Sequence, residues 1–223
     1  IRRLKRDVLG ELLPKRRHIV KLEHNSPHIG MLLAEEARIM GLGNDWEQYS
    51  YTLEQLQNTQ KARLAETSRI RHAIALAKVP YVIKYIEAEL MRVEKIVIFA
   101  HHQDVVEQIA QYFKAVAVSF TGQSSATAKQ DAVDRFQTDP EVRICVASIL
   151  AAGVGITLTA ANTVIFAELD WTGANVTQAE DRCHRIGQKR QVEVVHLILE
   201  KSIDMHLAQK IVEKQRIYEQ ALN

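Results

Sequence analysis

The sequence predicts an α/β fold over residues 80–223, with a doubly wound, mainly parallel sheet and helices on both of its faces. Two observations indicate this class. Short apolar runs such as residues 95–100 and 143–148 alternate with amphipathic segments such as residues 104–113, whose apolar residues recur at helical spacing. The runs are apolar at every position, which is typical of strands buried on both faces of a parallel sheet.

Local signals support the elements of this series. Val105, Ile109 and Phe113 share one face of a helix, and a serine at position 124 or 125 is suited to cap the start of another. The expected elements, in chain order, are a helix at 81–91, a strand at 95–100, a helix at 104–113, a strand at 115–120 and a helix from Ser124 or Ser125. They continue with strands at 143–148 and 163–167, a helix through residues 178–186, a strand at 192–199 and a final helix from Ser202.

Two further segments are expected ahead of residue 80. Residues 1–23 hold eight Lys or Arg against three acidic residues, which indicates a basic linker, either solvated or in contact with a phosphate backbone. An irregular stretch punctuated by prolines and glycines extends to Asn44. From Trp46 towards Pro80 apolar residues return at helical spacing, so we interpret residues 24–79 as a helical insertion or brace.

The composition is that of a globular protein. Of the 223 residues, 47% are hydrophobic and 25% are charged, which is enough for one large core or two small ones. No apolar run approaches the roughly 18 residues of a membrane span, and no leader opens the chain. We therefore expect an intracellular protein, cytoplasmic or nuclear, without a membrane partner. The two cysteines suit reduced, buried thiols, and a start at Ile1 rather than Met indicates a fragment of a longer protein.

Ligands of doubly wound sheets bind beyond the carboxyl ends of the strands, so the residues that follow each predicted strand form the candidate site. Gly153 and Gly155 would let backbone N–H groups approach a phosphate, although the same pattern occurs at a plain helix entry. Glu168 and Asp170 would act as an acid and base pair or cap the next helix, and Trp171 would stack on a base or pack. Adjacent histidines point to opposite faces of a strand and no third ligand is evident, so no metal site is expected. The other polar or small residues at this edge are His101, His102, Thr121, Gly122 and Ser148.

The sharpest signal is a pair of arginines. Gln178, Arg182 and Arg185 are spaced to share one face of a helix that is expected to stop at Gly187. Two neighbouring guanidiniums repel unless an anion lies between them, and the fixed donors of arginine suit a carboxylate or a phosphate. A bound anion and an ordinary ion pair with nearby carboxylates both remain open. The opposite, apolar face, which is expected to dock on the core, carries Val176, Ala179, Cys183 and Ile186.

These residues together resemble the second RecA-like lobe of the Swi/Snf-type ATPases, within superfamily two of the helicases and translocases. The resemblance covers nearly the whole chain apart from residues 24–75, and its wording is most similar to the annealing-helicase branch. The stretches that carry it are residues 96–102 (similar to motif IV), Thr121-Gly122 (the short motif after it), residues 148–161 (motif V), residues 178–188 (motif VI) and residues 2–15 (the segment that leads from the first lobe into the second).

The resemblance implies that the anion is the triphosphate of ATP, bound with Mg²⁺ by an N-terminal RecA-like lobe of the same polypeptide. Arg182 and Arg185 would act as arginine fingers, Gln178 would hold the γ phosphate or the attacking water, and Gly153 and Gly155 would lie on the nucleotide side. This chain alone is expected to be inactive. The residues implied in gripping the backbone of duplex or forked DNA, without reading its sequence, are His101, His102, Thr121, Gly122 and Ser148.

No phosphate loop of the form G-x-x-x-x-G-K-[S/T] occurs in the chain, so it would complete an ATP site rather than form one. Two alternatives stay open. One is a non-catalytic module that docks nucleic acid or protein, and it is favoured if the sequence upstream also lacks a phosphate loop. The other is a superfamily-two motor directed to RNA, and it is favoured if RNA rather than duplex DNA stimulates ATP hydrolysis.

Overall fold

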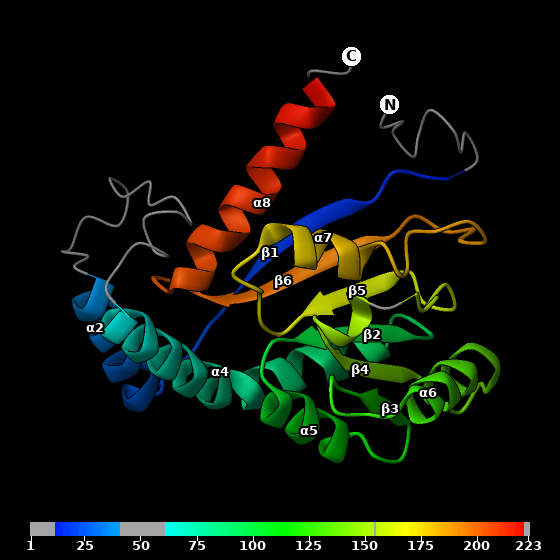
Figure 1. Cartoon of the computed structure of the whole chain (residues 1–223), viewed down its shortest axis with the longest axis horizontal. Coiled ribbons are helices and arrows are strands. Elements are labelled where there is room, and N and C mark those ends of the chain that lie inside the picture. The colour runs from blue at the N-terminus through cyan, green and yellow to red at the C-terminus, as the bar shows by residue number, and fades with distance from the viewer. Residues whose placement is uncertain (1–11, 41–60, 154, 221–223) are drawn as a thin grey trace.

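The structure is a computed structural model, and it describes residues 12–40, 61–153 and 155–220 (Figure 1). Most of the helix expected from Trp46 onwards lies outside the described residues. The elements are β1 (Arg16–Leu22), α2 (Pro27–Met40), α4 (Lys61–Leu90), β2 (Ile96–Ala100), α5 (Gln103–Tyr112), β3 (Ala117–Phe120), α6 (Ala126–Thr138), β4 (Ile144–Ser148), the 3₁₀ turn η1 (Ala151–Gly153), β5 (Thr163–Phe166), α7 (Gly173–Glu180), β6 (Glu193–Leu199) and α8 (Ile203–Gln220).

The strands of the described residues form one sheet of six, in the order β1-β6-β5-β2-β4-β3. Every neighbouring pair is parallel. From β2 the chain builds β3 and β4 on one side and then β5 and β6 on the other, which is the doubly wound arrangement. Strands β2, β4 and β5 are buried along their whole length, as their apolar runs indicate. The predicted fold class is therefore confirmed.

Helices cover both faces of the sheet, and each face has its own core (Figure 1). Alternate strand residues point to opposite faces, so Phe99 and Phe166 join the core beneath α6, α7 and α8, with ring centroids 5.3 Å apart. Ile98 and Ile165 join the core beneath α4 and α5. A side chain of this kind contributes roughly 1.5–3 kcal/mol when it is fully buried, so both layers stabilise the sheet that positions the site.

The expectation of an irregular segment before residue 44 is wrong for two stretches. Residues 16–22 form β1, which pairs with β6 from Arg16 opposite Glu193 to Leu22 opposite Leu199. Its pattern differs from the other strands because β1 is an edge strand, with exposed and half-buried residues in near alternation. Residues 27–40 form α2, which packs on the first half of α4. Part of the predicted basic linker is therefore a strand of the sheet.

Helix α4 continues through Pro80, where a change of element is expected from the sequence. A proline inside a helix removes one backbone hydrogen bond and crowds the preceding turn. Val79 and Val82 lie on either side of it and are buried against the sheet, and this packing keeps the helix continuous. The predicted brace and the sheet thus share one helix, while the domain boundary itself stays a prediction.

Two smaller expectations, a serine cap and buried reduced thiols, are also settled. Ser125 is the serine that caps α6, because its hydroxyl accepts a hydrogen bond from the Ala128 N–H at 3.1 Å. Cys145 and Cys183 are free and buried, and burial raises the pKa of Cys145 to about 12, so its thiol stays protonated. Among the described residues, no helix is both long enough and apolar enough to cross a membrane.

Candidate functional site

The residues that follow the strands lie along one rim, because neighbouring parallel strands end at the same edge of the sheet. Ala100 of β2 pairs with Ser148 of β4, so His101 leaves the sheet beside Ser148. Thr121 follows β3 on the outer side, and Glu168 follows β5 on the other side of β2. The predicted rim is therefore present, and the contacts of each residue decide what it can do there.

Arg182 and Arg185 do not lie on a helix, contrary to the prediction. Helix α7 ends at Glu180, and the two arginines lie in the turns that follow it. Short-range hydrogen bonds hold these turns, such as the one from the His184 N–H to the Glu180 carbonyl, and contacts from elsewhere in the chain add to them. The Leu158 N–H donates to the Arg182 carbonyl at 2.9 Å, and the Gln188 amide donates to three backbone carbonyls. On the predicted apolar face, Ile186 is 75% exposed, whereas the buried members are Val176, Ala179 and Cys183.

The three side chains predicted for catalysis nevertheless gather at one place, against Gly153 at the end of η1 and residues 155–157. Arg182 Nη2 donates to the Gly153 carbonyl at 2.9 Å, and Gln178 Nε2 donates to the same oxygen at 3.3 Å. Arg185 Nη1 donates to the Ile156 carbonyl at 3.1 Å. Residues 25 to 29 positions apart in the chain are thus brought together. The segment that resembles motif V and the segment that resembles motif VI are joined by these hydrogen bonds.

The charges of the arginine pair are only partly balanced among the described residues, where the charge of Asp181 acts on Arg182. No salt bridge joins either guanidinium to a carboxylate in the described part of the chain, where both donate only to carbonyl and hydroxyl oxygens. Burial, and then the neighbouring charge of Arg185, lower the pKa of Arg182, although an arginine stays protonated. Arg182 Nε is buried and has no hydrogen-bond partner among the described residues. Two adjacent cations with unused donors suit an anion.

Gly153 has a role that the sequence did not predict, beside the phosphate contact predicted for Gly153 and Gly155. The Gly153 carbonyl holds Arg182, and a Cβ at this position would lie 3.7 Å from Gln178 Oε1, an ordinary contact. Gly155 has a φ of +26°, a backbone conformation that residues other than glycine rarely adopt. No atom lies within 4 Å of the place that a Cβ would take at this position. The described contacts of Gly153 orient an arginine, and the contact of either glycine with a phosphate stays a prediction.

Glu180, the last residue of α7, is fully buried and anchors the arginine-bearing turns, residues 181–187. Lys15 Nζ lies 2.6 Å from one of its oxygens and Arg17 Nε donates to the other at 2.7 Å. Sequence reasoning missed this contact because 165 residues separate Lys15 from Glu180. One signal was available: spacings of four and three place Glu180 on the same helical face as Val176 and Cys183, and a carboxylate on an apolar face needs a cation.

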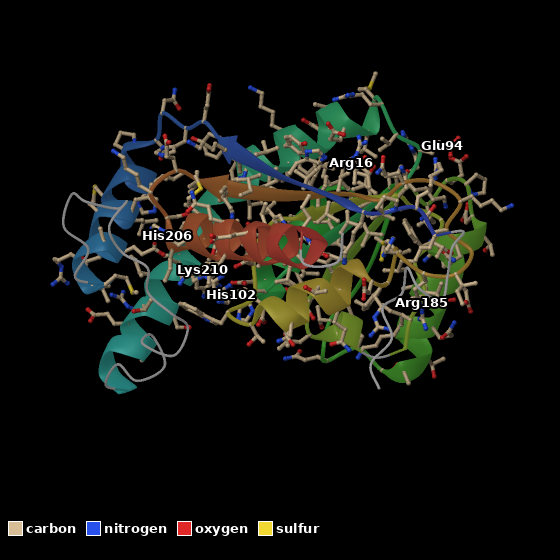
Figure 2. All side chains as sticks on the ribbon, turned by 90° about the horizontal axis from the view of Figure 1, so that it is seen from above. Arg16, Glu94, His102, Arg185, His206 and Lys210 are labelled. Carbon is tan, nitrogen blue, oxygen red and sulfur yellow. The ribbon has the colours of Figure 1, made fainter. Side chains whose placement is uncertain are left out.

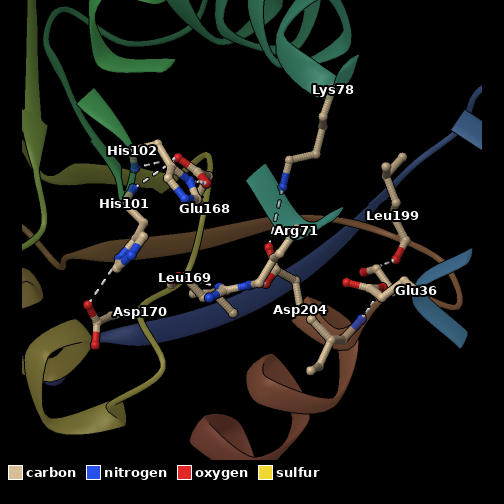
Figure 3. A network of polar contacts seen from close by, with 12 residues as sticks. Glu36, Arg71, Lys78, His101, His102, Glu168, Leu169, Asp170, Leu199 and Asp204 are labelled. Atoms are coloured by element: carbon tan, nitrogen blue, oxygen red, sulfur yellow. Dashed lines mark hydrogen bonds and ion pairs between the residues drawn. The ribbon is translucent and has the colours of Figure 1, made fainter. Parts of the chain in front are cut away.

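His101 and His102 contact the two carboxylates that follow β5 (Figure 3). Both backbone N–H groups donate to one oxygen of Glu168, at 3.0 and 2.9 Å, and His102 Nδ1 lies 2.6 Å from the other. His101 Nδ1 lies 3.2 Å from Asp170. Asp170 also accepts from the Thr172 N–H at 2.8 Å, at the start of α7. Glu168 and Asp170 thus hold the backbone at the entries to α5 and α7, although neither helix has a side-chain cap hydrogen bond from its N-cap residue, and both interpretations of these carboxylates stay predictions.

The other predicted DNA-binding residues differ in access. Gly122 is exposed, with no atom within 4 Å of where its Cβ would be, and Thr121 is half-buried. Ser148 is buried, and its hydroxyl accepts from the Ala151 N–H at 3.3 Å at the entry to η1. Figure 2 shows that the arginine pair, marked by Arg185, lies well apart from the histidine cluster, marked by His102. The rim therefore divides into two separate regions.

A buried polar network ties α4 to the rim and to α8 (Figure 3). Arg71 donates to Asp204 at 2.7 Å and to the Leu169 carbonyl, while Lys78 donates to a backbone carbonyl of β6 at 3.1 Å. The Arg71 guanidinium also lies 4.3 Å above the Trp171 ring, so Trp171 packs within the protein. Within the described residues no group of His, Cys, Asp or Glu is arranged to hold a metal ion.

Comparison with known proteins gives one family match and many relatives. Residues 77–187 match the helicase conserved C-terminal domain. The chain is 36% identical over 207 residues to a SWI/SNF-related matrix-associated actin-dependent regulator of chromatin subfamily A-like protein 1 homolog of Caenorhabditis elegans, covering 92% of this chain and 29% of that protein. It is 32% identical over 232 residues to the human DNA annealing helicase and endonuclease ZRANB3, covering 100% of this chain and 20% of that protein.

Solved structures of similar fold come from the same group of proteins. The Sulfolobus solfataricus SWI2/SNF2 ATPase core domain matches with a TM-score of 0.65 and 25% identity, covering 100% of this chain and 48% of that one. The same core in complex with dsDNA matches with a TM-score of 0.63 and 25% identity, covering 91% of this chain and 45% of that one. The chain thus spans less than a third of these two curated relatives and about half of each of these cores.

Proposed function

Because the chain belongs to the helicase conserved C-terminal domain family, with SWI/SNF-related helicases as its relatives, we propose that it is the second lobe of a DNA-dependent ATPase. An N-terminal RecA-like lobe of the same polypeptide would bind ATP and Mg²⁺, and this chain would complete the site. Alternate closing and opening of the two lobes would then drive translocation or strand annealing along duplex DNA.

The observation that carries the proposal is the arginine pair. Arg182 and Arg185 lie together against Gly153 and residues 155–157, and among the described residues their donors reach only carbonyl and hydroxyl oxygens. No described carboxylate lies within ion-pair distance of either guanidinium, although the Asp181 charge acts on Arg182. When the lobes close, the two guanidiniums would stabilise the charge that develops on the transferred phosphoryl group, and Gln178 would orient the γ phosphate or the attacking water. The chemistry of ATP and Mg²⁺ comes with the nucleotide, and this chain's own part is electrostatic.

The rim supports the DNA side of the proposal. A related ATPase core has been solved with dsDNA, and the rim of this chain offers accessible backbone at Gly122 and a hydroxyl at Thr121. His101 and His102 would contact phosphates from positions fixed by Glu168 and Asp170, and Ser148 would hold the turn beside them. Contacts of this kind position a protein on DNA without reading its sequence.

The test is Arg182→Ala in the full-length protein, with ATP turnover measured with and without duplex DNA. We expect turnover to fall by roughly 10³-fold or more while duplex binding persists, because the arginine acts on the developing charge and not on DNA. Arg190→Ala is the matched control, since Arg190 lies nearby but is exposed, and among the described residues its side chain contacts the Ala160 carbonyl and Glu94. Unchanged turnover of Arg182→Ala would refute the proposal and favour a docking module; stimulation by RNA alone would favour an RNA motor.

A further inference from the structure

The segment just before β1 is clamped onto the arginine-bearing turns, residues 181–187. His184 Nε2 lies 2.8 Å from the Leu13 carbonyl oxygen, and Gln191 Nε2 donates to the Pro14 carbonyl at 3.1 Å. These contacts join residues 171 and 177 positions apart in the chain. The stretch that the sequence resemblance places between the two lobes is therefore attached directly to the element that carries Arg182 and Arg185.

Charged side chains make the strongest part of this clamp. The side chains of Lys15, Arg17 and Glu180 are 11%, 6% and 0% exposed, and Lys15 Nζ reaches Asp181 at 3.1 Å as well as Glu180 at 2.6 Å. Burial by itself would raise the pKa of Glu180, but the Lys15 and Arg17 charges outweigh it and hold that pKa below its usual range. Glu180 is thus an ionised, buried carboxylate whose compensation comes from residues 15 and 17.

We propose that Lys15 and Arg17 are positioning residues for ATP hydrolysis: through Glu180 they hold the end of α7, and with it Arg182, in the orientation that the nucleotide requires. The inference rests on the proposed function, because it assigns the arginine pair to ATP. Glu180 ends α7 and Arg182 stands two residues later, so a shift of the clamped α7 end displaces the guanidinium directly. The first lobe would then be linked to the arginine pair through the chain as well as through the nucleotide.

The same strand provides an internal comparison. Lys21, near the other end of β1, also forms an ion pair with a glutamate, 2.7 Å from Glu200, but those side chains are 57% and 62% exposed. That pair lies at the C-terminal end of β6, whereas Leu13 and Lys15 lie near its N-terminal end, so the pair is separated from the clamp on α7. Replacing Lys21 removes one lysine charge, as replacing Lys15 does, but leaves the clamp intact. The Lys21 variant therefore distinguishes a general effect of lost charge from an effect on the arginine pair.

The experiment compares Lys15→Met, Lys15→Arg and Lys21→Met in the full-length protein by DNA-stimulated ATP turnover. Lys15→Met is expected to lower kcat by about 10- to 100-fold with little change in the KM for ATP, because a small misplacement affects the transition state more than ground-state binding. Lys15→Arg, which keeps the charge, should restore most of kcat, and Lys21→Met should leave it unchanged. If Lys15→Met is folded and turns over normally, the inference is wrong.

Two further variants keep the test decisive. If Lys15→Met does not fold, Glu180→Gln replaces it, since it preserves size and removes the charge that Lys15 and Arg17 hold; normal kcat there overturns the inference. Combining Lys15→Met with Arg182→Lys should give less than the product of the separate losses, because both act through one guanidinium. A full product would overturn it. Failure of the proposed function gives a different result, because Arg182→Ala would then retain ATP turnover, whether or not the Lys15 variants change it.

Discussion

Two glutamates, Glu180 at the end of α7 and Glu36 in α2, are equally buried but have opposite surroundings. Both have no exposed surface. Glu180 is paired with two cations: Arg17 donates to both of its oxygens, and Lys15 donates to one of them. Glu36 accepts one backbone hydrogen bond, from the Ile203 N–H at 2.9 Å, and its other oxygen has no partner among the described residues. Asp204 adds a like charge nearby, while Arg71 and Lys78 act on Glu36 only from a distance.

The difference shows that partners, not burial, decide whether a buried carboxyl is ionised. At Glu36 burial dominates and raises the pKa to about 7, although the Ile203 N–H opposes it. At Glu180 the Lys15 and Arg17 charges overcome the same effect and lower the pKa. The clamp beside the arginine pair therefore keeps its charge near neutral pH, whereas the network that attaches α2 to α8 gains or loses a proton there.

The largest expected effect on stability comes from breaking the fully paired carboxylate. Arg17→Met should lower the free energy of unfolding by about 3–5 kcal/mol, because it leaves Glu180 buried with half of its compensation. Urea unfolding of the chain measures this loss, and Arg16→Met is the control, since Arg16 is the exposed neighbour on the same strand. Equal losses in the two variants would show that Glu180 does not depend on Arg17.

Glu36, whose carboxyl has a hydrogen-bond partner on one oxygen, should instead make the free energy of unfolding depend on pH. The pKa of Glu36 in the folded chain, about 7, is above the usual 4.5, so its stabilising contribution is fully present below about pH 4.5 and is lost as pH rises through 7. By pH 8 the loss amounts to roughly 3 kcal/mol.

Glu36→Gln removes this titration, so the variant should gain stability relative to the parent chain between pH 5 and pH 8, as measured by urea unfolding at each pH. The comparison is a difference between two chains, so other buried groups cancel, including His196, whose pKa burial lowers to about 4. A stability difference that stays constant across this range would mean that Glu36 does not titrate near neutrality.

The smallest effect is expected where the pair is exposed. Lys21→Met breaks the 2.7 Å contact with Glu200, but both side chains are largely in solvent, so the free energy of unfolding should change by less than about 1 kcal/mol. Added salt should reduce even this change. A loss comparable to that of Arg17→Met would remove the distinction between buried and exposed pairs on β1.

Much of the site could be predicted from the sequence because its signals are local. The strand ends, Gly153 and Gly155, and the arginine spacing are all visible in short stretches, and the structure does place Gln178, Arg182 and Arg185 together beside Gly153 and Ile156. The prediction that a helix carries the arginines was wrong, because α7 ends at Glu180: short-range turn hydrogen bonds continue to His184, but the Arg182 carbonyl accepts from the Leu158 N–H. Their roles toward ATP and DNA stay predictions.

The sequence by itself determined the layer architecture and the residues on the rim, because periodicity and apolar runs follow from how neighbouring residues alternate along a helix or a strand. Only the tertiary structure decided that β1 is an edge strand, that α4 passes through Pro80, and which charges meet at Glu180. All three depend on contacts between different elements, and the pairing of β1 and the charges at Glu180 join residues more than a hundred positions apart, whose energies no local pattern records.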